Sequence, residues 1–211
     1  MPRELNGVVN NAGYALGGPV EGVPIDGWRQ QFEVNLFGQV AVTQAVLPKL
    51  RPVRGRIVFV SSMSGRVSTP MTGAYNASKY AVEGMADALR MELRPWRIRV
   101  ALIEPAQTDT DIWRDADASF DEAMAMISAE HKALYAKHIA AARKGIPRIQ
   151  KMLAPAEGVA AAIERALTAR RPRARYVVGA SAKAQSAMAK LTPRPLFDAT
   201  ISTAMGVPRK P

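Results

Sequence analysis

The sequence predicts an α/β fold, a doubly wound parallel sheet with helices on both faces, from two features that alternate along its 211 residues. Short apolar runs rich in valine and isoleucine, such as residues 56–61 and 99–103, are typical of buried strands. Between them lie longer segments whose apolar residues recur every three or four positions, which is the spacing of a helix. A regular strand-then-helix order favours a parallel sheet covered by helices.

The elements of the first half follow in order. Residues 5–10 form a short expected strand. A helix is expected over 26–50, with Asp26 as its N-cap and with Pro48 weakening its last turn. After the strand at 56–61 we expect a loop over 65–73 and a second long helix over 74–93, which ends before Pro95.

The second half continues the pattern after the strand at 99–103. Residues 117–144 are helical in pattern and rich in alanine and methionine, with few bulky branched residues, so we expect a mobile surface element and assign a substrate lid to 114–145. A helix over 155–170 and a strand over 175–178 follow, and the tail after Ser181 has no obvious partner strand. Without a repeat or linker, residues 1–211 are interpreted as a single domain.

Composition excludes several classes of function. The chain is 48% hydrophobic and 22% charged, its apolar runs are too short to span a bilayer, and no leader pattern opens it, so we expect a cytoplasmic globular protein. It has no cysteine and two histidines, which argues against a metal site. The net charge of +11 comes from scattered residues, and the densest group, Arg170, Arg171, Arg173 and Arg175, is interpreted as a solvated surface, so no nucleic-acid partner is expected.

The sharpest chemical signal is the run Tyr75-Asn76-Ala77-Ser78-Lys79 at the start of the second long helix. A spacing of four places Tyr75 and Lys79 on one helical face, where an ammonium can lower the pKa of a phenol toward the range useful for proton transfer. Such a pair is common by chance. Ser62 strengthens the interpretation, because it follows a strand at the edge where parallel sheets bind ligands.

Four motifs together resemble the short-chain dehydrogenase/reductase family, which has a Rossmann-like fold. In the family's order they are Asn10-Asn11-Ala12-Gly13, Val34-Asn35-Leu36-Phe37-Gly38, Ser61-Ser62 and the Tyr75–Lys79 run, and the resemblance extends over essentially the whole chain. It implies an oxidoreductase that transfers hydride between NAD or NADP, not distinguishable here, and an alcohol or carbonyl substrate.

The resemblance also implies roles for individual residues. Tyr75 is the general acid or base, Ser62 holds the substrate oxygen, Lys79 binds the nicotinamide ribose, and Asn35 disrupts its helix to support a proton relay through Lys79. Asn11, Ala12 and Gly13 lie beside the cofactor ribose, and Pro105 and Thr110 contact the nicotinamide, with Thr108 as the fallback for Thr110. Ala106 replaces the glycine that is usual after this proline, so we expect strain there if the position needs a positive φ.

Relative to the family pattern, the glycine-rich turn and the first three strands of the fold are missing. We therefore expect a truncated catalytic domain whose first strand is an exposed edge, and which by itself binds dinucleotide weakly and shows little activity. The alternative is an inactive fragment or pseudoenzyme that serves as a binding or assembly module. The resemblance further favours a lipophilic substrate, as for family members acting on retinoids or steroids, and a homo-oligomer formed through the helices at 26–50 and 74–93.

Overall fold

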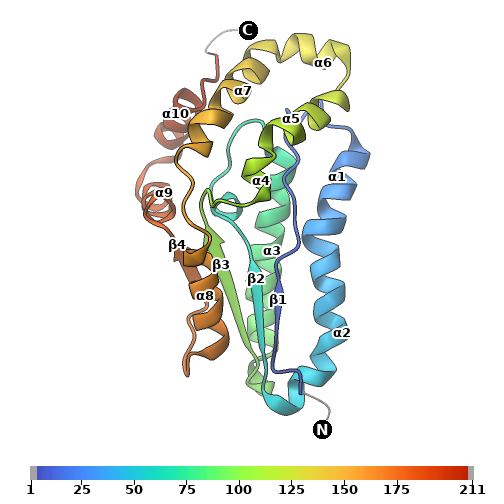
Figure 1. Ribbon diagram of the computed structural model, residues 1–211, viewed down its shortest axis with the longest axis vertical. Helices are drawn as coiled ribbons and strands as arrows, with labels where there is room; N and C mark the ends of the chain where they lie inside the picture. The colour runs from blue at the N-terminus through green and yellow to red at the C-terminus, as the bar shows by residue number, and fades with distance from the viewer. Residues whose placement is uncertain (1–3, 209–211) are drawn as a thin grey trace.

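Four parallel strands form one sheet in the computed structural model, which describes residues 4–208 (Figure 1). The strands are β1 (Gly7–Asn10), β2 (Arg56–Val60), β3 (Arg99–Pro105) and β4 (Arg175–Val178), and they lie side by side in the order β1-β2-β3-β4. All three strand pairs are parallel. The predicted α/β class is therefore confirmed, and β1 lies at one edge of the sheet, with Val9 36% exposed.

Side chains alternate between the two faces of the sheet, and each face is covered by helices. Ile57, Phe59 and Leu102 pack against helices α2 (Gly38–Val53) and α3 (Gly73–Glu92). Val58 and Ile103, the neighbours of these residues along the same strands, pack on the opposite side against α8 (Glu157–Thr168). The near-continuous apolar runs of the strands thus follow from burial on both faces.

The first long helix differs from the prediction in two ways. It begins at Ile25 after Pro24, so Asp26 is not the N-cap but lies in the first turn, where it pairs with Arg29. It is also divided into α1 (Ile25–Phe32), a π-helical turn η1 (Glu33–Phe37) and α2, which continues through Pro48 and Pro52 to Val53. It stops at Arg54, which follows α2 in a left-handed conformation (φ 54°), slightly beyond the predicted end at position 50.

The segment predicted as a mobile lid contains four helices with buried side chains of its own. They are α4 (Asp111–Arg114), α5 (Ala116–Ala125), α6 (Ala129–Leu134) and α7 (Ala136–Gln150). Phe120, Met124 and Ile127 are buried in a cluster with Leu16 and Val23 of the β1–α1 loop. The segment therefore contributes a second core to the protein, contrary to what its alanine-rich composition indicated.

The tail after β4 forms two helices, α9 (Ala180–Leu191) and α10 (Arg194–Ala204), instead of remaining without a partner. Ala182 and Phe197 from these helices are buried against Met63 and Val67, which lie in and just after the short 3₁₀ helix η2 (Met63–Gly65). A further 3₁₀ turn, η3 (Arg94–Trp96), links α3 to β3. The C-terminal helices thus support the loop that follows β2.

Neither a membrane-spanning helix nor a cluster of metal ligands occurs in residues 4–208, the part of the chain that the structure describes. None of the helices there is both long and apolar enough to cross a membrane. Within the same residues, histidine, aspartate and glutamate side chains form no group of three or more that could hold a metal ion.

Candidate active site

The segments expected to carry chemistry meet at the carboxyl end of the sheet. Because β1, β2 and β3 are parallel, residues 11–13, 61–62 and 106–110 all leave the sheet at the same edge. Helix α3 begins at Gly73 and carries Tyr75 and Lys79 in its first two turns. The ammonium of Lys79 donates a hydrogen bond to the carbonyl oxygen of Val60, the last residue of β2.

Asn35 lies fully buried in the π-helical turn η1 and connects this turn to two other elements. Its amide oxygen accepts a hydrogen bond from the backbone N–H of Tyr14, at 3.0 Å, and its amide nitrogen donates to the Tyr14 carbonyl and to the Ser78 hydroxyl, each at 3.0 Å. The predicted helix disruption at Asn35 is therefore present, and it holds the loop after β1 against helix α3. Single π turns of this kind are frequent at functional sites.

Lys79 is a buried lysine, 5% exposed, whose ammonium donates a hydrogen bond to the Val60 carbonyl at 2.9 Å. Burial lowers the pKa of Lys79 to about 8, and the negative charge of Glu83 opposes this change. The ammonium also faces Gly13, because a Cβ added to Gly13 would lie 3.6 Å from Nζ of Lys79 and 3.1 Å from Oδ1 of Asn35. A side chain at position 13 would thus fill the space beside both groups.

Tyr75 is partly buried beside Ser62, and its pKa is raised because burial disfavours the charged phenolate, while hydrogen bonding with the Ser62 side chain lowers it. The sequence predicted that Lys79 would lower the pKa of Tyr75. In the structure Nζ of Lys79 lies 5.8 Å from the centroid of the Tyr75 ring and is hydrogen-bonded to Val60, so burial determines the direction of the pKa shift. The phenol is consequently protonated at neutral pH.

Ser62 caps η2, because its hydroxyl accepts a hydrogen bond from the backbone N–H of Ser64 at 3.1 Å. That interaction fixes the position of the hydroxyl immediately after β2. Gly13, Asn35, Ser62, Tyr75 and Lys79 are thereby brought together, as the motif order implied. Asn11 and Ala12 are exposed in the adjoining loop.

In the segment after β3, threonine side chains donate hydrogen bonds to backbone carbonyls of the same segment. The Thr108 hydroxyl donates to the Ala106 carbonyl at 3.2 Å, and the Thr110 hydroxyl donates to the Thr108 carbonyl at 3.3 Å. Pro105 ends β3, and Thr110 precedes α4 with an extended backbone. Ala106 is absent from the described residues with positive φ, so the strain that we expected at this alanine does not occur.

Sequence reasoning missed a polar stripe that supports the site. Gln31 binds the Leu16 N–H and the Tyr14 carbonyl at 2.7 and 2.9 Å, and Gln39 donates to the Ala12 carbonyl at 3.1 Å. The stripe consists of Gln31, Asn35, Gln39 and Thr43, all buried and spaced by four residues. An α-helix has about 3.6 residues per turn, so a repeat of four drifts around it, and the wider π turn reduces that drift. A four-residue repeat of polar residues, at the spacing usual for the buried face of a helix, was the sequence feature that could have revealed this stripe.

Arg175 was also misinterpreted, as part of a solvated basic surface. Its side chain is 27% exposed, and it forms ion pairs with Glu83, Asp87 and Glu104 from two other elements. Arg170, Arg171 and Arg173 have no comparable ion pair within the described part of the chain.

Comparison with known proteins agrees with the geometry. The family model described as "short chain dehydrogenase" matches residues 2–120. This match covers more than half of the 211 residues, and it includes every segment of the tetrad Asn35, Ser62, Tyr75 and Lys79. The chain belongs to the short-chain dehydrogenase family.

Curated relatives are similar over most of the chain. A protein of Ornithobacterium rhinotracheale named NADPH-dependent 3-dehydrocapnine reductase is 37% identical over 189 residues, which cover 83% of this chain and 62% of that protein. Mouse retinol dehydrogenase 16 is 39% identical over 186 residues, which cover 86% of this chain and 58% of the relative. The chain thus spans about three fifths of the length of these two relatives.

Solved structures share the fold. A short-chain dehydrogenase from Streptomyces avermitilis superposes with a TM-score of 0.70 at 22% identity, covering 97% of this chain and 71% of that one. A short-chain dehydrogenase from Burkholderia cenocepacia in complex with NADP has a TM-score of 0.69 at 22% identity, with 97% and 70% coverage. At this identity the comparison establishes the fold.

Proposed function

We propose that this chain is the catalytic part of an oxidoreductase that interconverts an alcohol and a carbonyl compound with NAD or NADP as hydride carrier. The observation that carries the proposal is the convergence of Tyr75, Ser62 and Lys79 at the carboxyl end of the parallel strands, with Asn35 behind them in a π-helical turn. Family membership supports the same reaction class.

The residues present fit the nicotinamide-ribose end of such a dinucleotide. An ammonium has three donors, and among the described residues the Lys79 ammonium makes one hydrogen bond, to Val60. Two donors therefore remain for other partners, and Nζ lies beside the space that a Cβ at Gly13 would fill. We infer that Lys79 donates to ribose hydroxyls, that Asn11, Ala12 and Gly13 line the ribose, and that the segment from Pro105 to Thr110 contacts the nicotinamide. The dinucleotide would supply or accept the hydride.

Tyr75 is the residue that we propose donates the proton to the reacting oxygen of the substrate. Its raised pKa keeps the phenol protonated at neutral pH, so it can donate a hydrogen to a carbonyl oxygen that gains negative charge. Ser62, whose oxygen is already fixed by the Ser64 N–H, can donate its hydroxyl hydrogen to the same substrate oxygen. Asn35 acts at a distance, because it holds the Tyr14 backbone and the hydroxyl of Ser78, the residue before Lys79.

A lipophilic substrate is the finer part of the proposal. Retinol dehydrogenase 16, one of the relatives, is named for an apolar alcohol. A surface pocket of about 680 Å³ lies between the 20–28 segment and the proposed lid at 114–145, and Val20, Ile25, Trp28 and Met126 are among its lining residues. None of the four tetrad residues lines this pocket, so it would receive the apolar part of a substrate or form its entrance.

We also propose that two copies of the chain associate through the helices at 26–50 and 74–93. The interpretation of residues 1–211 as a single domain stays a proposal as well. Several large apolar side chains on these helices face outward: Val34 is 39%, Phe37 52%, Val42 46% and Tyr80 40% exposed. Burial of such a face between two copies would remove it from water.

The catalytic proposal is tested by Tyr75→Phe, with Tyr80→Phe as the control, because Tyr80 lies on the same helix with an exposed ring. Turnover is measured on this chain and on the longest reading frame that contains it, from the absorbance of reduced nicotinamide, with apolar and short polar alcohols and ketones. Tyr75→Phe should reduce turnover more than tenfold, equivalent to about 1.4 kcal/mol of barrier, and Tyr80→Phe should not. Retention of more than about a tenth of the rate by Tyr75→Phe would show that the proton is carried elsewhere.

A further inference from the structure

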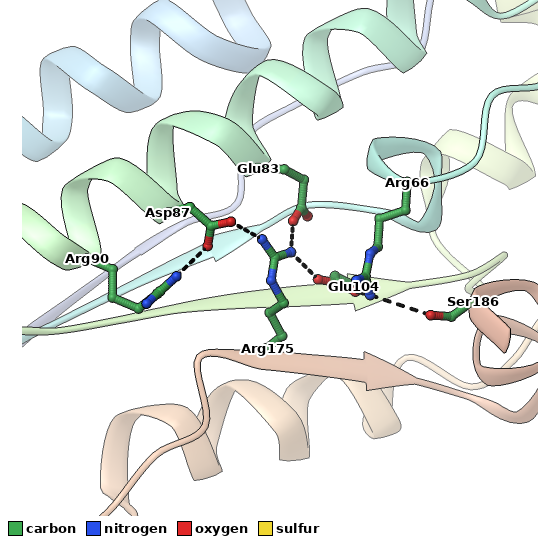
Figure 2. Close-up of polar contacts among 7 residues, drawn as sticks. All are labelled: Arg66, Glu83, Asp87, Arg90, Glu104, Arg175 and Ser186. Carbon is green, nitrogen blue, oxygen red and sulfur yellow. Dashed lines mark hydrogen bonds and ion pairs between the residues drawn. The ribbon is translucent and has the colours of Figure 1, made fainter. Parts of the chain in front are cut away.

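A cluster of charged side chains, which includes the buried Glu83 and Glu104, joins helix α3 to the sheet (Figure 2). At its centre Arg175, from the last strand β4, binds Glu83 and Asp87 of α3 and Glu104 of β3, the last at 2.7 Å. Glu104 is fully buried and is also held by Arg66, at 2.9 Å. Arg90 binds Asp87 at the outer end. Three arginines therefore face three carboxylates, and the cluster joins four segments of the chain.

Glu83 is the member of this cluster nearest to Lys79. It lies four residues after Lys79 on α3, which places both side chains on one face of the helix about one turn apart. Both are buried, at 6% and 5% exposure. A carboxylate and an ammonium that are both removed from water interact more strongly than the same pair at the surface.

Close packing at Gly65 holds Glu83 in place. A Cβ added to Gly65 would lie 2.9 Å from Cγ of Glu83 and 3.0 Å from both the Lys79 carbonyl and Oγ of Ser61. The short helix η2 therefore touches α3 at the peptide between the two charged residues. Oγ of Ser61 and Oε1 of Glu83 are both buried there without a hydrogen-bond partner at normal distance. The carboxylate of Glu83 is thus held by Arg175 through one of its two oxygens.

We propose that Glu83 is a positioning residue for Lys79: its carboxylate, neutralised from behind by Arg175, keeps the buried ammonium charged and available to the cofactor site. The inference rests on the proposed role of Lys79 in binding the cofactor. Burial alone favours the neutral amine, which has one donor fewer than the ammonium. After the hydrogen bond to Val60, a neutral amine would have only one N–H donor left for ribose hydroxyls, whereas the ammonium has two. Arg175 completes the arrangement, because an uncompensated pair of buried glutamates would favour a protonated carboxyl.

The groups that act on this pair come from every element around it. On α3 they are Tyr75, Lys79, Glu83 and Asp87; on β3 Glu104; on β4 Arg175; and after β2 the hydroxyls of Ser61 and Ser62 and the guanidinium of Arg66. The pKa of Glu83 is raised, because burial, together with the negative charge of Glu104, outweighs the effects of Ser61 and Arg175, which lower it. Burial lowers the pKa of Lys79, and Glu83 raises it.

A purely structural role for the cluster predicts a different result. In that case Glu83 and Asp87 would be equivalent, since each is a carboxylate on α3 that binds Arg175. Asp87 lies a further turn away from Lys79 and is more exposed, with 37% of its side chain accessible. Removing either charge would then weaken the attachment of β4 without changing the ionisation of Lys79.

The test is a titration of the Lys79 side chain by carbon NMR in the full 211-residue chain, with the signal assigned by its loss in Lys79→Met. Glu83→Gln should lower the pKa of Lys79 from about 8 by on the order of one unit, which is typical for losing an opposite charge one turn away. Asp87→Asn, the matched control, should leave it as in the wild type. Equal shifts in both variants, or none in Glu83→Gln, would overturn the proposal.

A second measurement does not depend on whether Glu83→Gln folds. In the wild type the carboxyl carbon of Glu83 should have the chemical shift of an ionised carboxylate at neutral pH, and a protonated carboxyl there would refute the inference. Binding of nicotinamide mononucleotide to the same samples is measured separately. If Lys79 titrates as expected but the nucleotide does not bind, the proposed function fails while the effect of Glu83 on Lys79 stands.

Discussion

Replacing Lys79 by methionine should make the free energy of unfolding depend less on pH between neutral and alkaline conditions. The wild-type lysine is buried and hydrogen-bonded to Val60, and its pKa in the folded protein is about 8, against 10.5 for a lysine in the unfolded chain. Between these two values the unfolded state binds more protons than the folded state, so wild-type stability rises as the pH rises.

The size of the effect follows from the two pKa values. Below about pH 8 the buried ammonium costs about 3 kcal/mol, from 1.36 kcal/mol for each unit between 10.5 and 8. Raising the pH from 7 to 9.5 should recover about 2 kcal/mol of this cost. Methionine carries no charge at either pH. The difference in unfolding free energy between Lys79→Met and the wild type should therefore shift by about 2 kcal/mol in favour of the wild type over this interval.

Urea unfolding at both pH values measures this difference directly. Other groups that titrate over the interval, such as tyrosines, contribute equally to both proteins and cancel. Lys49→Met, at an exposed position on α2, serves as the control and should show no such shift. If the difference between Lys79→Met and the wild type is the same at both pH values, then Lys79 is not a buried ammonium and the description of the site is wrong.

Three further predictions concern stability and assembly. Arg175→Met leaves the buried carboxylate of Glu83 without its arginine and should lower the unfolding free energy by about 3 kcal/mol in urea, whereas Arg171→Met, at an exposed position, should change it little. Gly18→Ala places a side chain at φ 139° and 2.7 Å from a neighbouring methyl group, so it should lower the thermal midpoint, and Gly17→Ala, whose Cβ meets nothing closer than 3.8 Å, should not. Phe37→Ser should weaken self-association at micromolar concentration by light scattering, and a strictly monomeric wild type would contradict the proposed interface.

The alternation of strands and helices could be predicted from local patterns. Residues 57–60 of β2 and 100–103 of β3 are apolar at every position because the sheet is covered on both faces. The spacing of Tyr75 and Lys79 places them on one helical face wherever the helix lies. These features depend on neighbours in the sequence, which is why periodicity was sufficient to find them. The burial of residues 114–145 was harder to predict, because alanine-rich helices give little sign of which face is buried.

Arg175 shows what the sequence alone could not determine. Next to Arg170, Arg171 and Arg173 it has the pattern of a solvated basic surface, and its partners Glu83 and Glu104 lie 92 and 71 residues away in the chain. Only the placement of β4 beside β3, with α3 packed across the sheet, brings the guanidinium to these carboxylates. The sequence determined which residues could carry charge and proton chemistry. The tertiary structure decided which charges are buried and paired, because burial and pairing depend on contacts between segments far apart in the chain.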